Sequence, residues 1–150
     1  MEIGLVNYTE KNINLQNKAY LQSGQAFVWK NDPSVRFTGS GTASVSQGIV
    51  DYCGLTSDGR FFAFDAKESK KDNFYVSKVP SHQTRFLDKI DAQKGVAFIF
   101  VFMFNEKQAK VWVRQGKKWI SLKSKDWVNP ENSFDYLHVV KFLGEKNGFA

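Results

Sequence analysis

A run of nine apolar residues, Val96–Phe104, constrains the fold of this chain more than any other segment. It is too short to cross a membrane, which takes about 20 apolar residues, and it is rich in the β-branched and aromatic residues that favour strands. A strand without a polar position has both of its faces buried. We therefore expect a sheet that is covered on both sides and has this run as its central strand.

Two helices are expected to supply that cover. The pattern predicts one over Glu10–Gln22, capped by Thr9 and ended by Gly24, and another between Pro80 and Gly95. Strand formers and turn residues predict the other elements: strands over Gln25–Lys30, Ile49–Leu55, Arg60–Lys67, Ala109–Arg114 and Lys118–Leu122, a turn at Gln115-Gly116, and a strand or short helix over Phe134–Leu143. This order favours a mixed α/β fold, with a central mixed β-sheet flanked by helices.

The chain of 150 residues is expected to form a single domain. Its stretch of lowest complexity, Thr38–Gln47, is too short for an interdomain linker and predicts a flexible loop or a mobile hairpin. No signal-peptide pattern opens the sequence, and the single cysteine, Cys53, has no partner for a disulfide within the chain. We expect a cytoplasmic protein that does not associate with membranes.

The charge balance favours a polyanionic partner. Lysine and arginine number 21 against 15 acidic residues, which gives a formal net charge of +6. The segment Lys107–Lys125 holds seven basic residues and no acidic one, and Trp112 and Trp119 lie within it, with Trp127 just beyond. Two interpretations stay open and are compatible: a nucleic-acid face on which the indoles stack on bases, or an amphipathic hairpin with tryptophan inward and lysine outward.

The strongest chemical signal lies between Gly48 and Lys71. Asp65 and Lys67 point to the same face of the predicted strand, because side chains alternate along a strand. A two-residue turn would put Asp51 opposite Ala66, whereas a three-residue loop, Ser57–Gly59, puts it opposite Asp65. We predict the three-residue loop, with Gly59 in a left-handed conformation.

Two carboxylates on one face can bind a hard divalent cation such as Mg²⁺. A lysine beside them can offset the charge that builds on a phosphate, so the set favours metal-assisted phosphodiester hydrolysis. The short pattern D-x-K is weak alone, since it usually marks a solvated strand edge. Asp51 on the neighbouring strand and a helix that begins with His82-Gln83 strengthen it. The sequence has no phosphate-binding G-x-x-x-x-G-K-[ST] loop, so no nucleotide cofactor is expected.

The chain resembles the RecU-type Holliday junction resolvases in six short motifs that follow one another in the same order. The family patterns are N-K-x-Y-x-x-x-G-x-A, D-Y-x-G, F-E-A-K-E-T, a helix with H-Q, G-G-x-x-F and D-Y-I-S-V-V. The matching residues are Asn17–Ala26, Asp51–Gly54, Phe64–Ser69, Ser81–Gln83, Gly95–Phe100 and Asp135–Val140.

The resemblance implies a restriction-endonuclease-like core and a Mg²⁺-dependent endodeoxyribonuclease that nicks four-way junctions, with Mn²⁺ as a substitute metal. Asp51 and Asp65 would be metal ligands, with Asp65 in place of the family's usual Glu, and Gln83 would complete the metal environment. Lys67 would stabilise the transition state, and Glu10 is a weaker candidate for the site. Expected DNA contacts are Lys70, Lys71, Arg85, Lys110, Arg114, Lys117 and Lys118.

A junction with two-fold symmetry needs two active sites related by that symmetry, which implies a homodimer. One departure bears on substrate choice: the segment between Pro33 and Asp51 is much shorter than the family's stalk, so Thr38–Gln47 would be a reduced stalk. A compact chain of this kind suggests a phage or prophage member of the family, acting in a bacterial or phage-infected host cell. Two other functions stay open: a nuclease of the same core that acts on flaps, ends or duplex DNA, and a DNA-binding recombination accessory protein that does not cleave.

Overall fold

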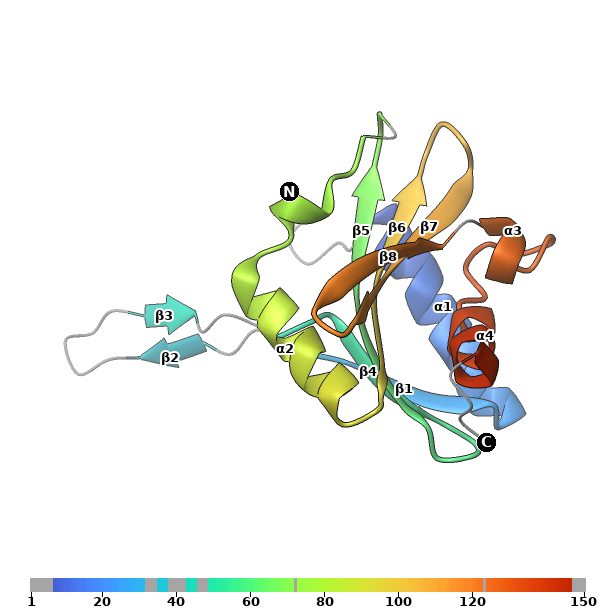
Figure 1. The fold of residues 1–150 in the computed structure, drawn as a ribbon, viewed down its shortest axis with the longest axis horizontal. Helices are drawn as coiled ribbons and strands as arrows, with labels where there is room; N and C mark the ends of the chain where they lie inside the picture. Colours follow the sequence, from blue (N-terminus) through green and yellow to red (C-terminus); the bar gives the residue numbers. More distant parts are fainter. Residues whose placement is uncertain are drawn as a thin grey trace.

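The structure, a computed structural model, describes residues 7–31, 35–37, 43–45, 49–71, 73–122 and 124–146. Its main sheet has six strands in the order β1-β4-β5-β6-β7-β8, and a separate pair is formed by β2 and β3 (Figure 1). The elements in chain order are α1 Tyr8–Ser23, β1 Ala26–Lys30, β2 Val35–Phe37, β3 Ala43–Val45, β4 Tyr52–Thr56, β5 Phe61–Ser69, the 3₁₀ helix η1 Val76–Lys78, α2 Ser81–Ala92, β6 Val96–Met103, β7 Gln108–Gln115, β8 Lys118–Leu122, α3 Ser124–Trp127 and α4 Leu137–Lys146.

The sheet is mixed because one of its strand pairs is parallel. β5 and β6 run parallel and are joined by α2, while the pairs β1–β4, β4–β5, β6–β7 and β7–β8 are antiparallel. Every residue of β6 is buried, which confirms the apolar run as a central strand. The predicted mixed α/β architecture is therefore confirmed.

Helices cover both faces of the sheet (Figure 1). On one face, Phe62 and Phe64 of β5 pack in a cluster with Ile13 of α1 and with apolar residues of α4. On the other face, Ala63 of β5 packs in a second cluster with Leu87 of α2. Asp65 lies two residues beyond Ala63, so it points to the α2 side of the sheet.

The first helix starts two residues earlier than predicted. Its N-cap is Asn7, whose side-chain oxygen accepts a hydrogen bond from the backbone N–H of Glu10 at 2.8 Å. The prediction of Thr9 as the cap is wrong, because Thr9 lies inside the first turn, is fully buried, and directs its own N–H to Glu68. Gly24 ends the helix at φ 76°, as predicted.

The β4–β5 hairpin has the predicted three-residue loop. Thr56 N–H donates to the carbonyl of Arg60 at 2.9 Å, so Ser57, Asp58 and Gly59 form the loop, and Gly59 has φ +84°. Tyr52 pairs with Phe64, and one step further along the same register Asp51 lies opposite Asp65. Loop length thus brings the two aspartates together, because a loop one residue shorter would have put them on opposite faces.

Two further segments differ in detail from their predictions. The β7–β8 turn is formed by Gly116 and Lys117, one residue later than predicted, since Gln115 pairs with Lys118 and both turn residues have positive φ. The last apolar segment is a helix, α4, which resolves the choice left open by the sequence. In the part of the chain that the structure describes, no helix is long and apolar enough to cross a membrane.

The low-complexity segment Thr38–Gln47 lies largely outside the described residues. Its residues Ala43–Val45 form β3, which pairs antiparallel with β2, and the rest of the prediction for this segment falls on residues that the structure does not describe. Figure 1 shows the β2–β3 pair standing away from the main sheet, beyond α2.

Candidate active site

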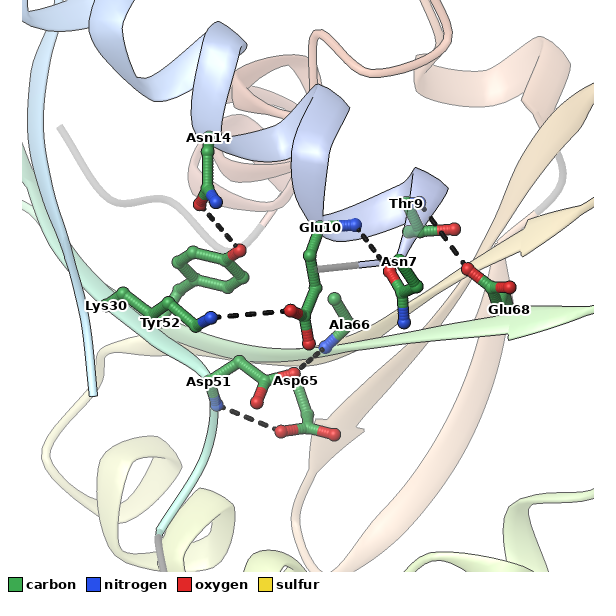
Figure 2. A network of polar contacts seen from close by, with 10 residues as sticks. All are labelled: Asn7, Thr9, Glu10, Asn14, Lys30, Asp51, Tyr52, Asp65, Ala66 and Glu68. Atoms are coloured by element: carbon green, nitrogen blue, oxygen red, sulfur yellow. Dashed lines mark hydrogen bonds and ion pairs between the residues drawn. The ribbon is translucent and has the colours of Figure 1, made fainter. Parts of the chain in front are cut away.

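Asp51 and Asp65 are fixed by backbone hydrogen bonds across the β4–β5 pair (Figure 2). The N–H of Asp51 donates to Asp65 Oδ1 at 2.9 Å, and the N–H of Ala66 donates to Asp51 Oδ2 at 2.9 Å. Each carboxylate therefore accepts one of these two hydrogen bonds through a single oxygen. The other oxygen of each carboxylate, Oδ1 of Asp51 and Oδ2 of Asp65, takes part in neither of them. Sheet register, and not loop flexibility, determines the spacing of the pair.

Lys67 and Gln83 join this pair from β5 and α2. The Nζ atom of Lys67 lies 2.7 Å from Asp65 Oδ2 and 3.2 Å from Gln83 Oε1. Asp65 is almost fully buried, at 2% exposure, so the lysine offsets a charge that water cannot screen. Gln83 lies in the first turn of α2, which explains why a residue 16 positions after Lys67 reaches the same point.

Glu10 approaches the same carboxylates from the first turn of α1. Figure 2 shows its side chain directed toward Asp51 and Asp65. Its Oε2 atom forms an ion pair with Lys30 Nζ of β1 at 3.3 Å. The negative charge of Glu10 contributes to raising the pKa of Asp51. Within the described ranges, no three acidic, histidine or cysteine side chains lie close enough to hold a metal by themselves. Glu10 is thus near the carboxylate pair and does not complete a ligand set in this arrangement.

Electrostatics distinguish the two aspartates. Burial, followed by the charge of Asp65, raises the pKa of Asp51 to about 7 from its ordinary 3.8. Lys67 balances Asp65, and Asp51 has no comparable ion pair among the contacts seen here. Asp51 therefore holds its proton more readily than an ordinary aspartate, and a cation placed between the two carboxylates would favour its ionised form.

The oxygen atoms at this point fit a small, hard cation. Asp65 Oδ2 and Gln83 Oε1 both contact Lys67 Nζ and so lie close together, and Asp51 supplies a carboxylate whose ionisation a cation would favour. All three are oxygen donors, the type that Mg²⁺ prefers, with water in its remaining positions. Asp51, Asp65 and Gln83 are thus compatible with the metal set predicted from the sequence.

The tryptophans of the basic segment are held by protein contacts. Trp127 is buried and packs edge-on against Phe100, so the idea that it stacks on bases is wrong. Trp112 and Trp119 are partly buried against the second core cluster, as the amphipathic alternative expects for tryptophan. The same alternative expects lysine to point into solvent, and Lys110 differs: its Nζ atom lies over the Trp112 ring, 4.7 Å from the ring centre.

Arg114, a predicted DNA contact, is already engaged within the protein. Its Nε and Nη2 atoms donate to the two carboxylate oxygens of Asp88 at 2.7 and 3.4 Å, and its guanidinium lies 4.9 Å from the centre of the Trp119 ring. These contacts tie β7 to α2 and to β8. The other predicted DNA contacts are solvent-exposed apart from the half-buried Lys110: Lys70, Lys71, Arg85, Lys117 and Lys118.

The sequence interpretation included Lys70 and Lys71 of the connection between β5 and α2 and missed Tyr75 and Lys78. Tyr75 and Lys78 of this connection border a groove that also includes Lys67. The signal was available in principle, because this connection starts just after Lys67 and ends just before Gln83, so both of its ends lie near the site. Lys30, the ion-pair partner of Glu10, was missed because nothing in the sequence aligns β1 with α1.

Comparisons with known proteins find several similar sequences. The Holliday junction resolvase RecU of Mycoplasmopsis pulmonis is 35% identical over 119 residues, which cover 79% of this chain and 73% of that protein. The same-named protein of Staphylococcus carnosus is 29% identical over 61% of this chain and 50% of its own length, and that of Bacillus subtilis is 27% identical over 65% and 52%. This chain therefore spans about half the length of several curated relatives.

Among solved structures, Archaeoglobus fulgidus Hjc, a Holliday junction resolvase from an archaeal hyperthermophile, matches at a TM-score of 0.45 and 10% identity. The match covers 77% of this chain and 88% of that one. The family profile described as Recombination protein U matches residues 7–141, which include both aspartates, Lys67 and Gln83. Because this match extends over most of the sequence, the chain belongs to the RecU family.

Proposed function

We propose that this chain is a metal-dependent endodeoxyribonuclease that nicks four-way DNA junctions, the activity for which its RecU relatives are named. One observation carries the proposal: Asp51 and Asp65 lie opposite each other, with Lys67 Nζ 2.7 Å from Asp65 Oδ2. Two adjacent carboxylates and a lysine are the groups that metal-assisted phosphodiester hydrolysis requires. The proposed setting is the bacterial cytoplasm, where recombining DNA is found.

Asp51, Asp65 and Gln83 are the proposed ligands of Mg²⁺, for which Mn²⁺ can substitute. When bound, the metal supplies Lewis-acid polarisation of the scissile phosphate and lowers the pKa of a bound water. Asp51 and Asp65 would hold that ion in a defined position, because backbone hydrogen bonds fix both carboxylates. Glu10 is proposed to join the site from α1, since its charge already acts on Asp51.

Lys67 has a separate proposed role in the transition state. Its ammonium balances Asp65 in the protein alone and is half-buried, so it is held in place without being shielded from a substrate. An ammonium in this position donates hydrogen bonds to the phosphate oxygens on which negative charge increases during hydrolysis. Gln83 orients the lysine through the hydrogen bond at its Oε1.

The basic surface supplies the proposed contacts with DNA phosphates. Lys70 and Lys71 follow the strand that carries Asp65 and Lys67, and Arg85 lies on the exposed side of α2. Lys117 and Lys118 extend the surface at the β7–β8 turn. Such contacts contribute affinity that falls steeply with salt and carries no sequence information.

A homodimer is proposed because two opposed strands of a two-fold symmetric junction need two active sites. Exposed apolar side chains on α1 and on the neighbouring strands offer one candidate interface. These are Leu15, Leu21, Phe27 and Leu55. Sedimentation of the wild type and of a Leu21→Ser Phe27→Ser variant tests this surface, and a variant as dimeric as the wild type would exclude it.

The test of function compares an immobile four-way junction, a linear duplex and a flap, each labelled on one strand at a time, with Mg²⁺ or with EDTA. The proposal expects paired symmetric nicks in the junction, which EDTA and Asp51→Asn abolish and Asp58→Asn does not. Asp58 lies in the exposed loop of the same hairpin, so it is a matched control for the chemical change.

Two other outcomes would replace the proposal. Equal cutting of the duplex or flap would retain the metal site and indicate a nuclease without junction selectivity, as the short β2–β3 pair would allow. Tight junction binding without cutting under any divalent metal would instead indicate a recombination accessory protein.

A further inference from the structure

The connection between β5 and α2 borders a groove of about 500 Å³ that begins at Lys67. Among the lining residues that the structure describes, four are lysines, Lys67, Lys70, Lys71 and Lys78, and one carries a carboxylate, Glu68. An oxygen of this carboxylate accepts a hydrogen bond from the backbone of α1, so part of its charge is engaged there. The groove is therefore a basic channel that continues from the candidate active site.

This connection is held firmly at several points. The hydroxyl of Ser69 accepts a hydrogen bond from the Asn73 N–H at 3.0 Å, and the carbonyl of Ser69 accepts one from the Phe104 N–H at 3.0 Å. Phe74 packs against the second core cluster, and Val79 is buried. The residues on both sides of Tyr75 are thus anchored to the protein body.

Tyr75 lies between these anchors with its side chain in solvent. It is 57% exposed, whereas its neighbour Phe74 packs on the core. Lys78 Nζ lies 5.7 Å from the centre of the Tyr75 ring, which adds a cation to the same surface. An exposed ring on an anchored backbone, surrounded by lysines, is the combination with which proteins bind single-stranded nucleic acid.

We propose that this groove binds the DNA strand that continues from the scissile phosphate, with Lys70, Lys71 and Lys78 on its phosphates and Tyr75 stacked on one of its bases. The inference rests on the proposed nuclease function and adds a substrate subsite to it. Lys67 is shared by the active site and the groove, so a strand whose phosphate reaches Lys67 enters the groove directly.

Stacking on Tyr75 requires a base with one free face. In linear duplex DNA each base is covered by its neighbours, whereas bases have a free face in single strands and at the branch point of a four-way junction in its open form, the form that it takes without divalent metal. The groove therefore favours branched and single-stranded DNA over duplex. It would contribute to substrate choice in a chain whose β2–β3 pair is short.

The test measures DNA binding by fluorescence anisotropy in EDTA, with three probes: a 12-nucleotide single strand, an immobile four-way junction and a linear duplex. Tyr75→Ala should weaken binding to the first two about tenfold and leave duplex binding within about twofold, whereas Tyr75→Phe should keep wild-type affinity because the ring is retained. Fluorescence of 2-aminopurine at the branch point should be quenched by the wild type and by Tyr75→Phe, and not by Tyr75→Ala.

A second variant tests the lysines independently of the ring. Lys78→Ala should lower the slope of log affinity against log salt by about one, since one phosphate contact is lost. Lys141→Ala is the matched control, because Lys141 is exposed on α4, which covers the opposite face of the sheet. Unchanged slopes in both variants would overturn the assignment of Lys78 to the groove.

The proposal would be overturned if Tyr75→Ala bound all three probes like the wild type, or lost affinity for the duplex by the same factor as for the single strand. The failure of the proposed function has a different signature. If single-strand binding depends on Tyr75 while the junction is never cut, the groove stands and the nuclease assignment falls. If Tyr75→Ala binds all three probes and cuts the junction like the wild type, the groove alone falls.

Discussion

Asp51→Asn should make the protein more stable at alkaline pH in the absence of metal. Burial and the charge of Asp65 raise the pKa of Asp51 to about 7, so above that pH the folded state holds a carboxylate that would be more stable in water. Asparagine keeps an oxygen to accept the hydrogen bond from the Ala66 N–H, and its side-chain amide can replace the carboxyl group of Asp51 in the side-chain hydrogen bond with Asp65. The substitution therefore removes the charge and keeps the geometry.

The size of the effect follows from the pKa difference. Between its ordinary value of 3.8 and about 7, the native state retains a proton that the unfolded chain has released, so the free energy of unfolding falls as pH rises through this window. At about 1.36 kcal/mol for each pH unit, the upper limit is about 4 kcal/mol. Asp51 is only half-buried, and screening by solvent reduces this to about 2 kcal/mol.

Thermal unfolding in EDTA measures the gain. For a domain of this size, about 2 kcal/mol corresponds to a Tm higher by about 4–8 °C at pH 8. The gain should shrink below pH 7 and nearly vanish at pH 4. Asp58→Asn should give no gain at either pH, because the hydrogen bond from the Thr56 hydroxyl lowers the pKa of Asp58. A gain that is equally large at pH 4, or no gain at pH 8, would refute this account of Asp51.

Three further predictions concern the metal, the basic hairpin and packing. Millimolar Mg²⁺ should raise the wild-type Tm at pH 8 by several degrees and that of Asp51→Asn much less, and an equal rise in both would exclude Asp51 as a ligand. Arg114→Ala should destabilise the protein by about 1–2 kcal/mol in urea unfolding, since it loses a bidentate ion pair and a ring contact, while Lys118→Ala should be neutral; equal midpoints would contradict the structural role. Gly54→Ala should cost about 1–3 kcal/mol in the same assay, because its Cβ would lie 2.5 Å from Phe62 Cζ, and an unchanged midpoint would show that the ring moves freely.

The features that were predictable from the sequence are set by short-range rules. The β4–β5 loop could be predicted from the two aspartates. Asp51 and Asp65 lie on one face only if the loop has an odd number of residues, and Gly59 suits the left-handed position of a three-residue loop. The central strand could be predicted because a run as apolar as Val96–Met103 must be covered on both faces.

The features that were not predictable depend on contacts between distant segments. The ion pair of Glu10 with Lys30 requires α1 to lie beside β1, and nothing local determines that. The burial of Trp127 against Phe100 likewise depends on how the chain returns to the sheet after β8. The raised pKa of Asp51 is the clearest case, because it depends on burial and on the neighbouring carboxylates and not on the identity of the residue.

Cap and turn positions were off by one or two residues for a related reason. Thr9 and Asn7 are both good cap residues. Asn7 is the cap because Thr9 is buried within the first turn of the helix. At the β7–β8 turn, two residues with positive φ complete the hairpin, and the second of them is Lys117, a residue type that gives no such signal in the sequence.

The central claim is that Asp65 serves catalysis and is not needed for DNA binding. The direct measurement is single-turnover cleavage of a four-way junction by the wild type and by Asp65→Asn, with junction affinity measured for both proteins under the same conditions. The account predicts that cleavage falls by more than about a hundredfold, because a metal ligand is lost, while affinity is unchanged or higher because a negative charge beside the phosphates is removed. Cleavage at the wild-type rate by Asp65→Asn, or loss of binding together with cleavage in a folded variant, would contradict it.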